Sequence, residues 1–327
     1  MQLFQTISRK SLSIWLSLLC MLSLWSSFSL SASAEDTIPF PIAWQQSEGS
    51  GAEEQRLAYL PEVDNWCDYP WNRGTETGNT VGQAGCSLLS IVNAVYYRTG
   101  SFLHPAKLAQ FALDNGYRIP GVDGAAMGFF PAVAQAAEES HMTFAGWTTQ
   151  AAAVLEHLRN GGTASANIAG HWIALVDYDV TTDQYLMLDS SQISSRAEHI
   201  AWTDRKNGVA WLSEAVLLEN GRNGYYGINN RYFALYTFDV PYTLGDVNQD
   251  DVISVEDARL VLQYYASTAA SLDFRLHPQI VTHNAGISAA DIDGNGLVTV
   301  QDATAILSYY AQQAAGAEPS WGQVLCG

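Results

Sequence analysis

The residues of this chain that could do covalent chemistry are a cysteine, a histidine and an aspartate that lie far apart in the sequence. Cys86 follows Gly85 at the start of the run GCSLLSIVNAVYY, in which apolar residues recur at helical spacing. A cysteine at a helix N-terminus gains about 0.3 to 1 kcal/mol for its thiolate form, less than one pKa unit. Because an ordinary thiol has a pKa near 8.5, we expect Cys86 to be a strong nucleophile only if a histidinium lies beside it.

The candidate histidine and carboxylate lie on one predicted β-hairpin. His171 opens an apolar strand, residues 179–183 are turn-like, and a second strand ends at Asp189. Paired positions in an antiparallel hairpin have a constant index sum, and a turn centred near Val180 gives a sum of about 360, which pairs His171 with Asp189. A carboxylate there would fix the imidazole tautomer and stabilise its charged form, as thiolate catalysis requires.

A second chemical pattern is a repeat near the C-terminus. Segments 246–266 and 291–311 are similar, and each begins with a loop that has oxygen-bearing side chains at alternate positions. This spacing suits Ca²⁺, which takes six to eight oxygen ligands. The predicted ligands, at positions 1, 3, 5, 7 (a backbone carbonyl), 9 and 12 of each loop, are Asp246, Asn248, Asp250, Val252, Ser254 and Asp257, then Asp291, Asp293, Asn295, Leu297, Thr299 and Asp302.

The two loops differ from each other and from an EF-hand. Position 12 is Asp in both, where an EF-hand has Glu, and no amphipathic helix is predicted before either loop. Position 6, which needs a left-handed turn, is Asp251 in the first loop and Gly296 in the second. We therefore expect the first site to be strained but occupied. Apolar residues at helical spacing follow each loop: Ala258, Val261, Leu262 and Tyr265, then Ala303, Ile306, Leu307 and Tyr310.

Composition and targeting signals divide the chain into four predicted segments. These are a signal peptide (1–34), a flexible polar arm (35–57), a globular domain (58–240) and the repeat-bearing domain with its tail (241–327). The apolar run of the first segment, about a dozen residues, is too short for a membrane helix, and no later stretch is long and apolar enough. We expect a secreted, extracellular protein without a membrane span.

Charge and cysteine content narrow the function further. The 327 residues are 48% hydrophobic, and 33 acidic against 15 basic residues give a formal charge of −18, which argues against a nucleic-acid partner. Without the signal peptide, Cys67, Cys86 and Cys326 remain. Because three is an odd number, at least one thiol must be free. A disulfide between Cys67 and Cys86 stays an alternative that would remove the nucleophile.

The pair of loops with exiting helices resembles a type I dockerin, the module that attaches enzymes to cohesin domains of a cellulosome scaffold. The resemblance covers about residues 244–311 and implies two Ca²⁺ ions as cofactors and a cohesin domain as partner. The alternative is an acidic tail with a chance repeat. Tyr242 and Trp321 could clasp the two ends of the module. By resemblance, the residues that would face cohesin are Val255, Glu256, Val300 and Gln301.

The globular domain resembles papain-like cysteine peptidases of the bacteriocin-processing kind. The motifs that carry the resemblance are GCSLLSIVNAVYY, LRNGG at 158–162, GHWIALVDYD and YLMLDS. The resemblance implies an α+β fold without a cofactor in this domain, with Cys86 as nucleophile, His171 as general base and Asp189 as the residue that orients it. The implied activity is hydrolysis of a peptide or protein amide through a Cys thioester.

One departure from that family concerns the oxyanion hole. The family commonly has a Gln about six residues before the Cys, where this chain has Thr80, and the nearest Gln is Gln83. Two other functions therefore stay open: an inactive papain-like binding domain, and a carbohydrate-active hydrolase carried by the dockerin.

The aromatic residues Trp66, Tyr69 and Trp71 could line a substrate groove or pack in the core.

Overall fold

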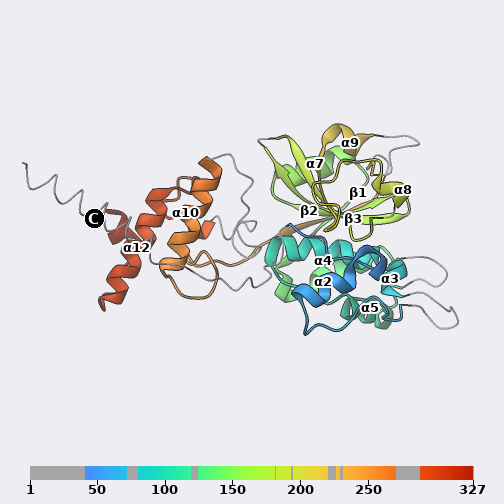
Figure 1. Ribbon diagram of the computed structural model, residues 1–327, viewed down its shortest axis with the longest axis horizontal. Helices are drawn as coiled ribbons and strands as arrows, with labels where there is room; N and C mark the ends of the chain where they lie inside the picture. Colours follow the sequence, from blue (N-terminus) through green and yellow to red (C-terminus); the bar gives the residue numbers. More distant parts are fainter. Residues whose placement is uncertain are drawn as a thin grey trace, which may run out of the picture. The chain divides into compact units, whose positions relative to one another are not determined.

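The computed structural model describes residues 41–71, 80–118, 124–180, 182–192, 194–219, 226–228, 231–269 and 288–326, so the predicted signal peptide lies outside the described residues. Within the described ranges, no helix is both long and apolar enough to cross a membrane. The elements up to residue 240 are η1 (Glu48–Ser50), α2 (Ala52–Tyr59), α3 (Val81–Ala84), α4 (Cys86–Thr99), α5 (Pro105–Asp114), α6 (Phe129–Ala136), η2 (Glu138–Ser140), β1 (Met142–Thr148), α7 (Ala151–Arg159), β2 (Thr163–Ile168), β3 (His171–Asp179), β4 (Gln184–Leu188), α8 (Ser194–Ala197), β5 (Val209–Ser213), α9 (Glu214–Leu218) and β6 (Phe233–Phe238) (Figure 1).

The six strands form one antiparallel sheet in the order β1-β6-β2-β3-β4-β5. Helix α4 covers one face, where Ala94 and Tyr97 share a core with Ala174 and other residues of β3 and β4. Helix α7 covers the other face, where Val154 shares a core with Ile173 and other strand residues (Figure 1). Because both faces are covered, β3 is apolar along most of its length rather than alternating with polar residues. The expected α+β class is confirmed.

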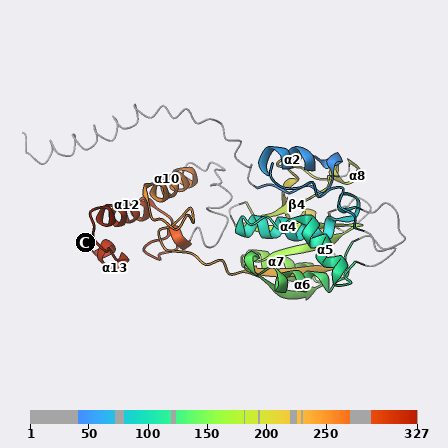
Figure 2. The same ribbon diagram turned by 90° about the horizontal axis from the view of Figure 1, so that it is seen from below.

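Helix α4 is the most buried helix of this part, and the residue at its N-terminus is Cys86. Gly85 joins it to α3, and a Cβ on Gly85 would lie 2.4 Å from the carbonyl oxygen of Val81, so only glycine fits this junction. Gly100, with φ 68°, ends the helix, and α5 packs beside it (Figure 2). The prediction that Cys86 heads a buried helix is confirmed, and tight packing on the sheet fixes its position.

The segment before residue 58 differs from the expected flexible arm. Residues 42–46 are buried, the backbone N–H of Ala43 donates to Asn207 over 2.8 Å, and that of Trp44 donates to the side chain of Asn93 over 2.7 Å. Helices η1 and α2 follow this segment. For residues 41–57 the expectation of a flexible arm is wrong, because the short apolar segment before the polar residues is anchored in the core.

The C-terminal part contains α10 (Val255–Ala269), α12 (Val300–Ala314) and α13 (Trp321–Cys326). Helices α10 and α12 pack against each other through a core that includes Val261 and Ile306 (Figure 2). As predicted, one helix follows each repeated loop. The described residues just before the first loop are not helical, and residues 288–290 form a helical turn before the second loop. The expectation that no amphipathic helix enters the second loop falls largely on residues outside the described ranges.

Candidate functional site

The predicted histidine and aspartate lie in direct contact. His171, the first residue of β3, and Asp189, which follows β4, are joined by a hydrogen bond of 2.6 Å between Nε2 and Oδ1. Both side chains are buried. Because Nε2 is bound to the carboxylate, Nδ1 is the ring nitrogen that remains for the thiol.

The contact arises from a register different from the predicted one. The pairs next to the turn, such as Tyr178 with Tyr185, sum to 363, and past the irregularity in β3 the pair Ala174 with Leu188 sums to 362. Continued by one residue, this register puts Asp189 opposite Ile173, two positions from His171. The two residues are therefore diagonal neighbours on one face of the sheet, which still lets their side chains meet.

Cys86 completes the group from the helical side. Burial raises the pKa of the Cys86 thiol, but its hydrogen bond to His171, the charge of that ring and the backbone N–H of Trp172 lower the pKa below its ordinary value. Burial also lowers the pKa of His171, but the charge and hydrogen bond of Asp189 and the contact with Cys86 raise it to about 9. Both directions favour a thiolate beside an imidazolium.

Asp189 is held by more groups than the sequence indicated. Oδ1 also accepts from the backbone N–H of Ser191 over 2.8 Å. Oδ2 accepts from the Tyr226 hydroxyl over 2.8 Å and from Nη2 of Arg196 over 3.4 Å. Burial raises the pKa of Asp189, but the charges of His171 and Arg196 and these hydrogen bonds lower it below its usual range. The sequence analysis did not select Arg196 and Tyr226 as site residues. Both lie in polar segments without a motif, so a charged and a hydroxyl-bearing side chain were the only signals.

The predicted oxyanion-hole residue Gln83 has another role in the structure. Its side chain is exposed, and Oε1 accepts from the backbone N–H of Thr80 in the cap of α3. A different glutamine, Gln46, lies between the two halves of the site. Its backbone N–H donates to Ser190, next to Asp189, over 2.8 Å, and its buried side-chain Nε2 donates to Gly82, four residues before Cys86, over 3.0 Å. Gln46 was missed because it lies in the segment interpreted as a flexible arm.

The remaining sequence alternatives near Cys86 are resolved by the structure. Cys67 and Cys86 are both free thiols, so no disulfide joins them. Burial and nearby carboxylates raise the pKa of Cys67 to about 12, which makes it an inert thiol. Trp66 and Trp71 are fully buried and belong to the core, so they do not line a groove.

The second repeated loop brings its carboxylates together. Asp291, Asp293 and Asp302 each offer an oxygen, and these oxygens lie within 4.8 Å of one another. The backbone N–H groups of Asn295 and Gly296 bind Asp291 over 3.1 and 2.8 Å. Three carboxylates this close repel one another unless a cation lies among them, so the donor set fits Ca²⁺.

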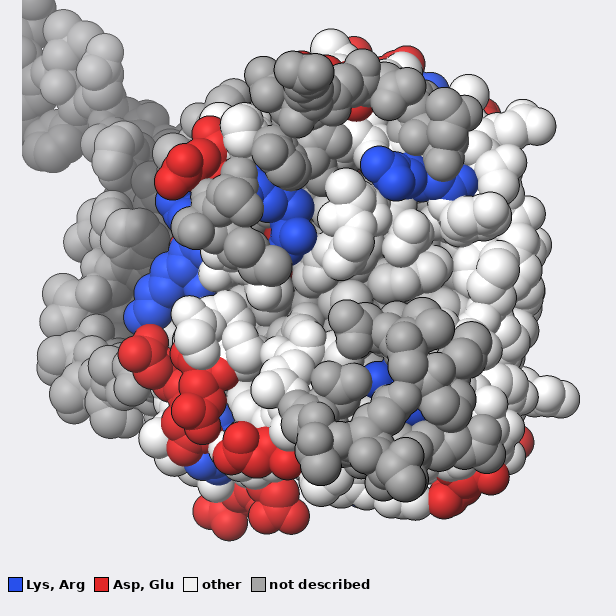
Figure 3. Space-filling model, turned by 90° about the vertical axis from the view of Figure 1, so that its right-hand side faces the viewer, with Lys and Arg blue, Asp and Glu red and all other residues white. Residues whose placement is uncertain are grey.

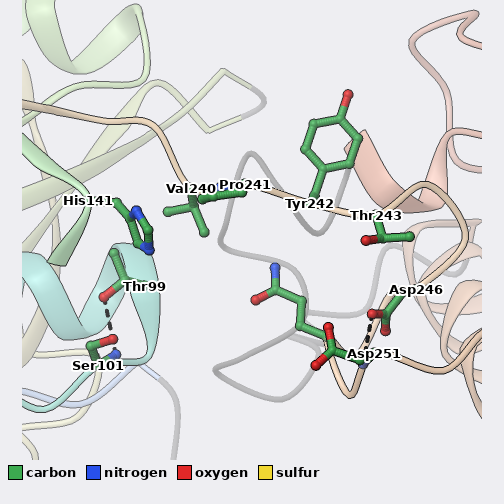
Figure 4. A pocket seen from close by; sticks show the side chains of 10 residues that line it. Thr99, Ser101, His141, Val240, Pro241, Tyr242, Thr243, Asp246 and Asp251 are labelled. Carbon is green, nitrogen blue, oxygen red and sulfur yellow. Dashed lines mark hydrogen bonds between the residues drawn. The ribbon is translucent and has the colours of Figure 1, made fainter. Parts of the chain in front are cut away.

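The first loop repeats this hydrogen-bond pattern. The backbone N–H groups of Asp250 and Asp251 bind Asp246 over 3.1 and 3.0 Å, and the second of these bonds is drawn in Figure 4. Asp257, fully buried, accepts from the backbone N–H groups of Val247 and Asn248. Burial and the neighbouring carboxylates Asp257 and Asp250 raise the pKa of Asp246, although the two backbone hydrogen bonds oppose this. The predicted ligand positions of both loops thus share one local geometry.

Two further expectations about the loops can be compared with the structure. The position-9 hydroxyls of Ser254 and Thr299 bind the position-12 carboxylates over 3.1 and 2.8 Å, so they support Asp257 and Asp302. In the first loop Asp251 has φ 65°, where its counterpart Gly296 has φ 84°. The expected strain at Asp251 is confirmed.

The residues expected to face a partner are exposed. Val255 and Val300 are 51% and 41% exposed, and Glu256 and Gln301 lie beside them on the surface. Four of the apolar residues that recur at helical spacing after the loops also lie at the surface. These are Leu262, Tyr265, Leu307 and Tyr310. The two helices therefore present equivalent apolar positions to solvent.

The ends of the C-terminal part meet through the predicted Trp321, but its partners differ from the predicted Tyr242. The ring of Trp321 stacks on Tyr309 with 4.3 Å between ring centroids. It also lies against Gly245, where a Cβ would come within 2.3 Å of the ring. Tyr242, the predicted partner, is 52% exposed.

Comparison with known proteins identifies the C-terminal part of the chain. Residues 244–309 match the family described as the dockerin type I domain. No curated protein and no solved structure matches the chain. Type I dockerins bind calcium and cohesin domains. The chain therefore carries a type I dockerin domain at residues 244–309, which implies a cohesin-binding component of a cellulosome.

Proposed function

We propose that the part before the dockerin is a papain-like cysteine peptidase domain that hydrolyses peptide or protein amides through a thioester on Cys86. The observation that carries this proposal is the 2.6 Å hydrogen bond between His171 and Asp189, with the Cys86 thiol at the same imidazole ring. A cysteine with a lowered pKa, a histidine with a raised pKa and a buried carboxylate form the group that thiol hydrolases need.

The first half of the reaction would use the thiolate and the imidazolium. The Cys86 sulfur attacks the amide carbonyl carbon, and the carbonyl π electrons move to its oxygen. When the tetrahedral intermediate collapses, the C–N bond breaks and His171 donates its proton to the leaving amine. The acyl group is then held on Cys86 as a thioester.

The second half would use His171 as a base. Neutral His171 takes a proton from water, the resulting hydroxide attacks the thioester, and the C–S bond breaks to release the acid and restore the thiolate. Asp189 keeps the ring in the tautomer with its proton on Nε2 throughout.

Two donors could stabilise the oxyanion. The backbone N–H of Cys86, at the first position of α4, has no partner within its own helix. We assign the role first given to Gln83 to Gln46, a buried amide that bridges Ser190 and Gly82. An amide nitrogen has two N–H groups, and its bond to Gly82 uses one of them.

The face on which α3 lies carries charges of both signs around a mostly uncharged middle. In Figure 3, which views this side, the described residues of the middle are mostly other than Lys, Arg, Asp and Glu, basic residues lie in the upper half, and acidic residues gather at the lower left.

The test of the peptidase proposal is digestion of a peptide library by the full mature chain, followed by mass spectrometry. We expect cleavage products from the native chain, none from Cys86→Ala, and native activity from Cys67→Ala, which removes a different, buried thiol. Products that persist in Cys86→Ala would reject Cys86 as nucleophile. A well-folded native chain that cleaves no member of a diverse library would favour a binding domain, and sugar release from plant polysaccharide by Cys86→Ala would favour a carbohydrate-active hydrolase.

We also propose that the dockerin binds two Ca²⁺ ions, one in each loop, and that the secreted chain attaches to a scaffold cohesin. The ligands would be the residues at positions 1, 3, 5, 7 and 12 of each loop, with Val252 and Leu297 contributing carbonyls. Cohesin would contact Val255, Glu256, Val300 and Gln301, which are exposed. Calcium titration by calorimetry should give a stoichiometry of two, and Val255→Asp with Val300→Asp should abolish cohesin binding at unchanged calcium stoichiometry. A stoichiometry of one, or unchanged cohesin binding, would contradict these assignments.

A further inference from the structure

The oxygen of Asp189 that faces away from His171 has two partners that the proposed reaction does not use. Oδ2 accepts from the hydroxyl of Tyr226 over 2.8 Å and from Nη2 of Arg196 over 3.4 Å. The two partners are joined to each other, since the guanidinium carbon of Arg196 lies 5.5 Å from the centre of the Tyr226 ring. The same Nη2 of Arg196 donates to the carbonyl of Ser191 over 2.5 Å, which ties Arg196 to the segment that follows Asp189.

All members of this cluster are buried. Asp189 is fully buried, Tyr226 is 2% exposed, and His171 and Arg196 are each 5% exposed. Burial and the charge of Asp189 raise the pKa of Tyr226 far above physiological pH, so this hydroxyl stays protonated and donates. Asp189 therefore faces one titratable cation, His171, one fixed cation, Arg196, and two neutral donors, Tyr226 and the Ser191 N–H.

The proposed reaction requires a fixed positive charge, Arg196, beside Asp189. When His171 gives its proton to the leaving amine, Asp189 loses the positive charge that compensates its own. A buried carboxylate without a compensating charge costs several kcal/mol and tends to take up a proton. A protonated Asp189 would no longer hold the His171 tautomer that exposes Nδ1 as a base for the second half-reaction.

We propose that Arg196 and Tyr226 are positioning residues of the Cys86 site: they hold Oδ2 of Asp189 and keep the carboxylate ionised, so that Oδ1 stays directed at Nε2 of His171 in both protonation states of the ring. This inference rests on the proposed thiol hydrolase function. The sequence order does not suggest it, because Arg196 and Tyr226 come from separate polar segments after the hairpin.

The test measures the alkylation rate of Cys86 by iodoacetamide in the full mature chain between pH 4 and 8, read at the Cys86 peptide by mass spectrometry. In Arg196→Gln, Asp189 loses an opposite charge and should protonate at higher pH. We expect the acid limb of the rate profile to move up by about one pH unit, so that alkylation on this limb is about tenfold slower at equal pH. Arg196→Lys, which keeps the charge, should leave the acid limb close to its native position, whereas a merely structural role of Arg196 would change the melting temperature and not the profile.

Tyr226→Phe keeps every charge and removes one hydrogen bond, and it carries the test if Arg196→Gln does not fold. Its acid limb should move in the same direction by about half a pH unit. Folded variants with the native profile would overturn the positioning role. A native Cys86 that reacts no faster at pH 6 than free cysteine would instead reject the proposed function itself, so the two failures can be told apart.

Discussion

The raised pKa of His171 predicts how the proposed peptidase activity depends on pH. His171 must be protonated to donate to the leaving amine, and its pKa is raised to about 9, first by the charge of Asp189. We expect kcat/KM for peptide hydrolysis to fall as the pH rises through about 9, where an ordinary histidine would lose its proton near 6.5. In Asp189→Asn the alkaline limb should move down towards 6.5, as stopped assays at several pH values would show. An alkaline limb that stays in place in Asp189→Asn would contradict the assignment of the orienting residue.

A single glycine near the carboxylate offers a test that changes no functional group. Gly208 has φ 67°, and a Cβ there would lie 2.2 Å from the Asp189 carbonyl oxygen and 2.7 Å from Nε2 of Gln45. Because Asp189 must shift to relieve this clash, we expect Gly208→Ala to lower kcat/KM at least tenfold. Gly146, also at positive φ but with open space around it, is the matched control, and Gly146→Ala should keep most of the activity. Equal kcat/KM values for the two variants would show that catalysis does not depend on the close approach of Gly208 to Asp189.

At the scale of elements, sequence patterns predicted helices and loops better than contacts between them. Helix α4 and the two calcium loops follow from local spacing, which a one-dimensional pattern records. The predicted index sum of the hairpin, about 360, was too low by two to three because the turn is centred further along the chain than expected, so that the pairs next to it already sum to 363. The irregularity in β3 between Leu175 and Asp177 changes the sum by only one, to 362. Gln46, Arg196 and Tyr226 reach the site from distant segments, and no periodicity marks such contacts.

The unequal loops of the dockerin lead to a prediction at the same scale. Asp251 adopts φ 65° with a side chain, where the second loop has a glycine. A non-glycine residue in this conformation costs about 1 to 2 kcal/mol. We therefore expect Asp251→Gly to bind calcium at the first loop about tenfold more tightly than Asp251→Ala, two variants that lack the same charge. Calorimetric titration would measure the difference, and Gly296→Ala should weaken the second loop by a similar factor. Equal affinities of the two Asp251 variants would show that the backbone conformation does not limit binding.

At the scale of the whole molecule, the acidic excess is concentrated in part at the calcium loops. Six Asp residues occupy predicted ligand positions there, and the dockerin match at 244–309 covers both loops. The dockerin was predictable because its ligands are local in sequence. The peptidase proposal also depends on the contact of Cys86 with the predicted His171–Asp189 pair, and only the fold shows that contact.

Because the calcium loops and the proposed catalytic residues lie in different parts of the chain, we predict that calcium removal affects cohesin binding and not peptide hydrolysis. The Cys86 cluster contains no calcium ligand, and the core of the dockerin helices is separate from the cores around the sheet. We expect a chelator to abolish cohesin capture, because apo loops carry unbalanced carboxylates. The same chelator should leave the rate of peptide hydrolysis within about twofold. Parallel pull-down and hydrolysis assays would measure both, and a large loss of hydrolysis would show that the two parts depend on each other.

The most direct measurement for the proposed catalytic centre is the alkylation rate of Cys86 at pH 6, in the native chain and in His171→Gln. An ordinary thiol with a pKa near 8.5 is less than about 1% thiolate at this pH. If Cys86 and His171 form a thiolate–imidazolium pair, native Cys86 should react at least about tenfold faster than free cysteine, and His171→Gln should remove this advantage. Native Cys86 that reacts no faster than free cysteine, or a rate that His171→Gln leaves unchanged, would contradict a nucleophilic centre at this site.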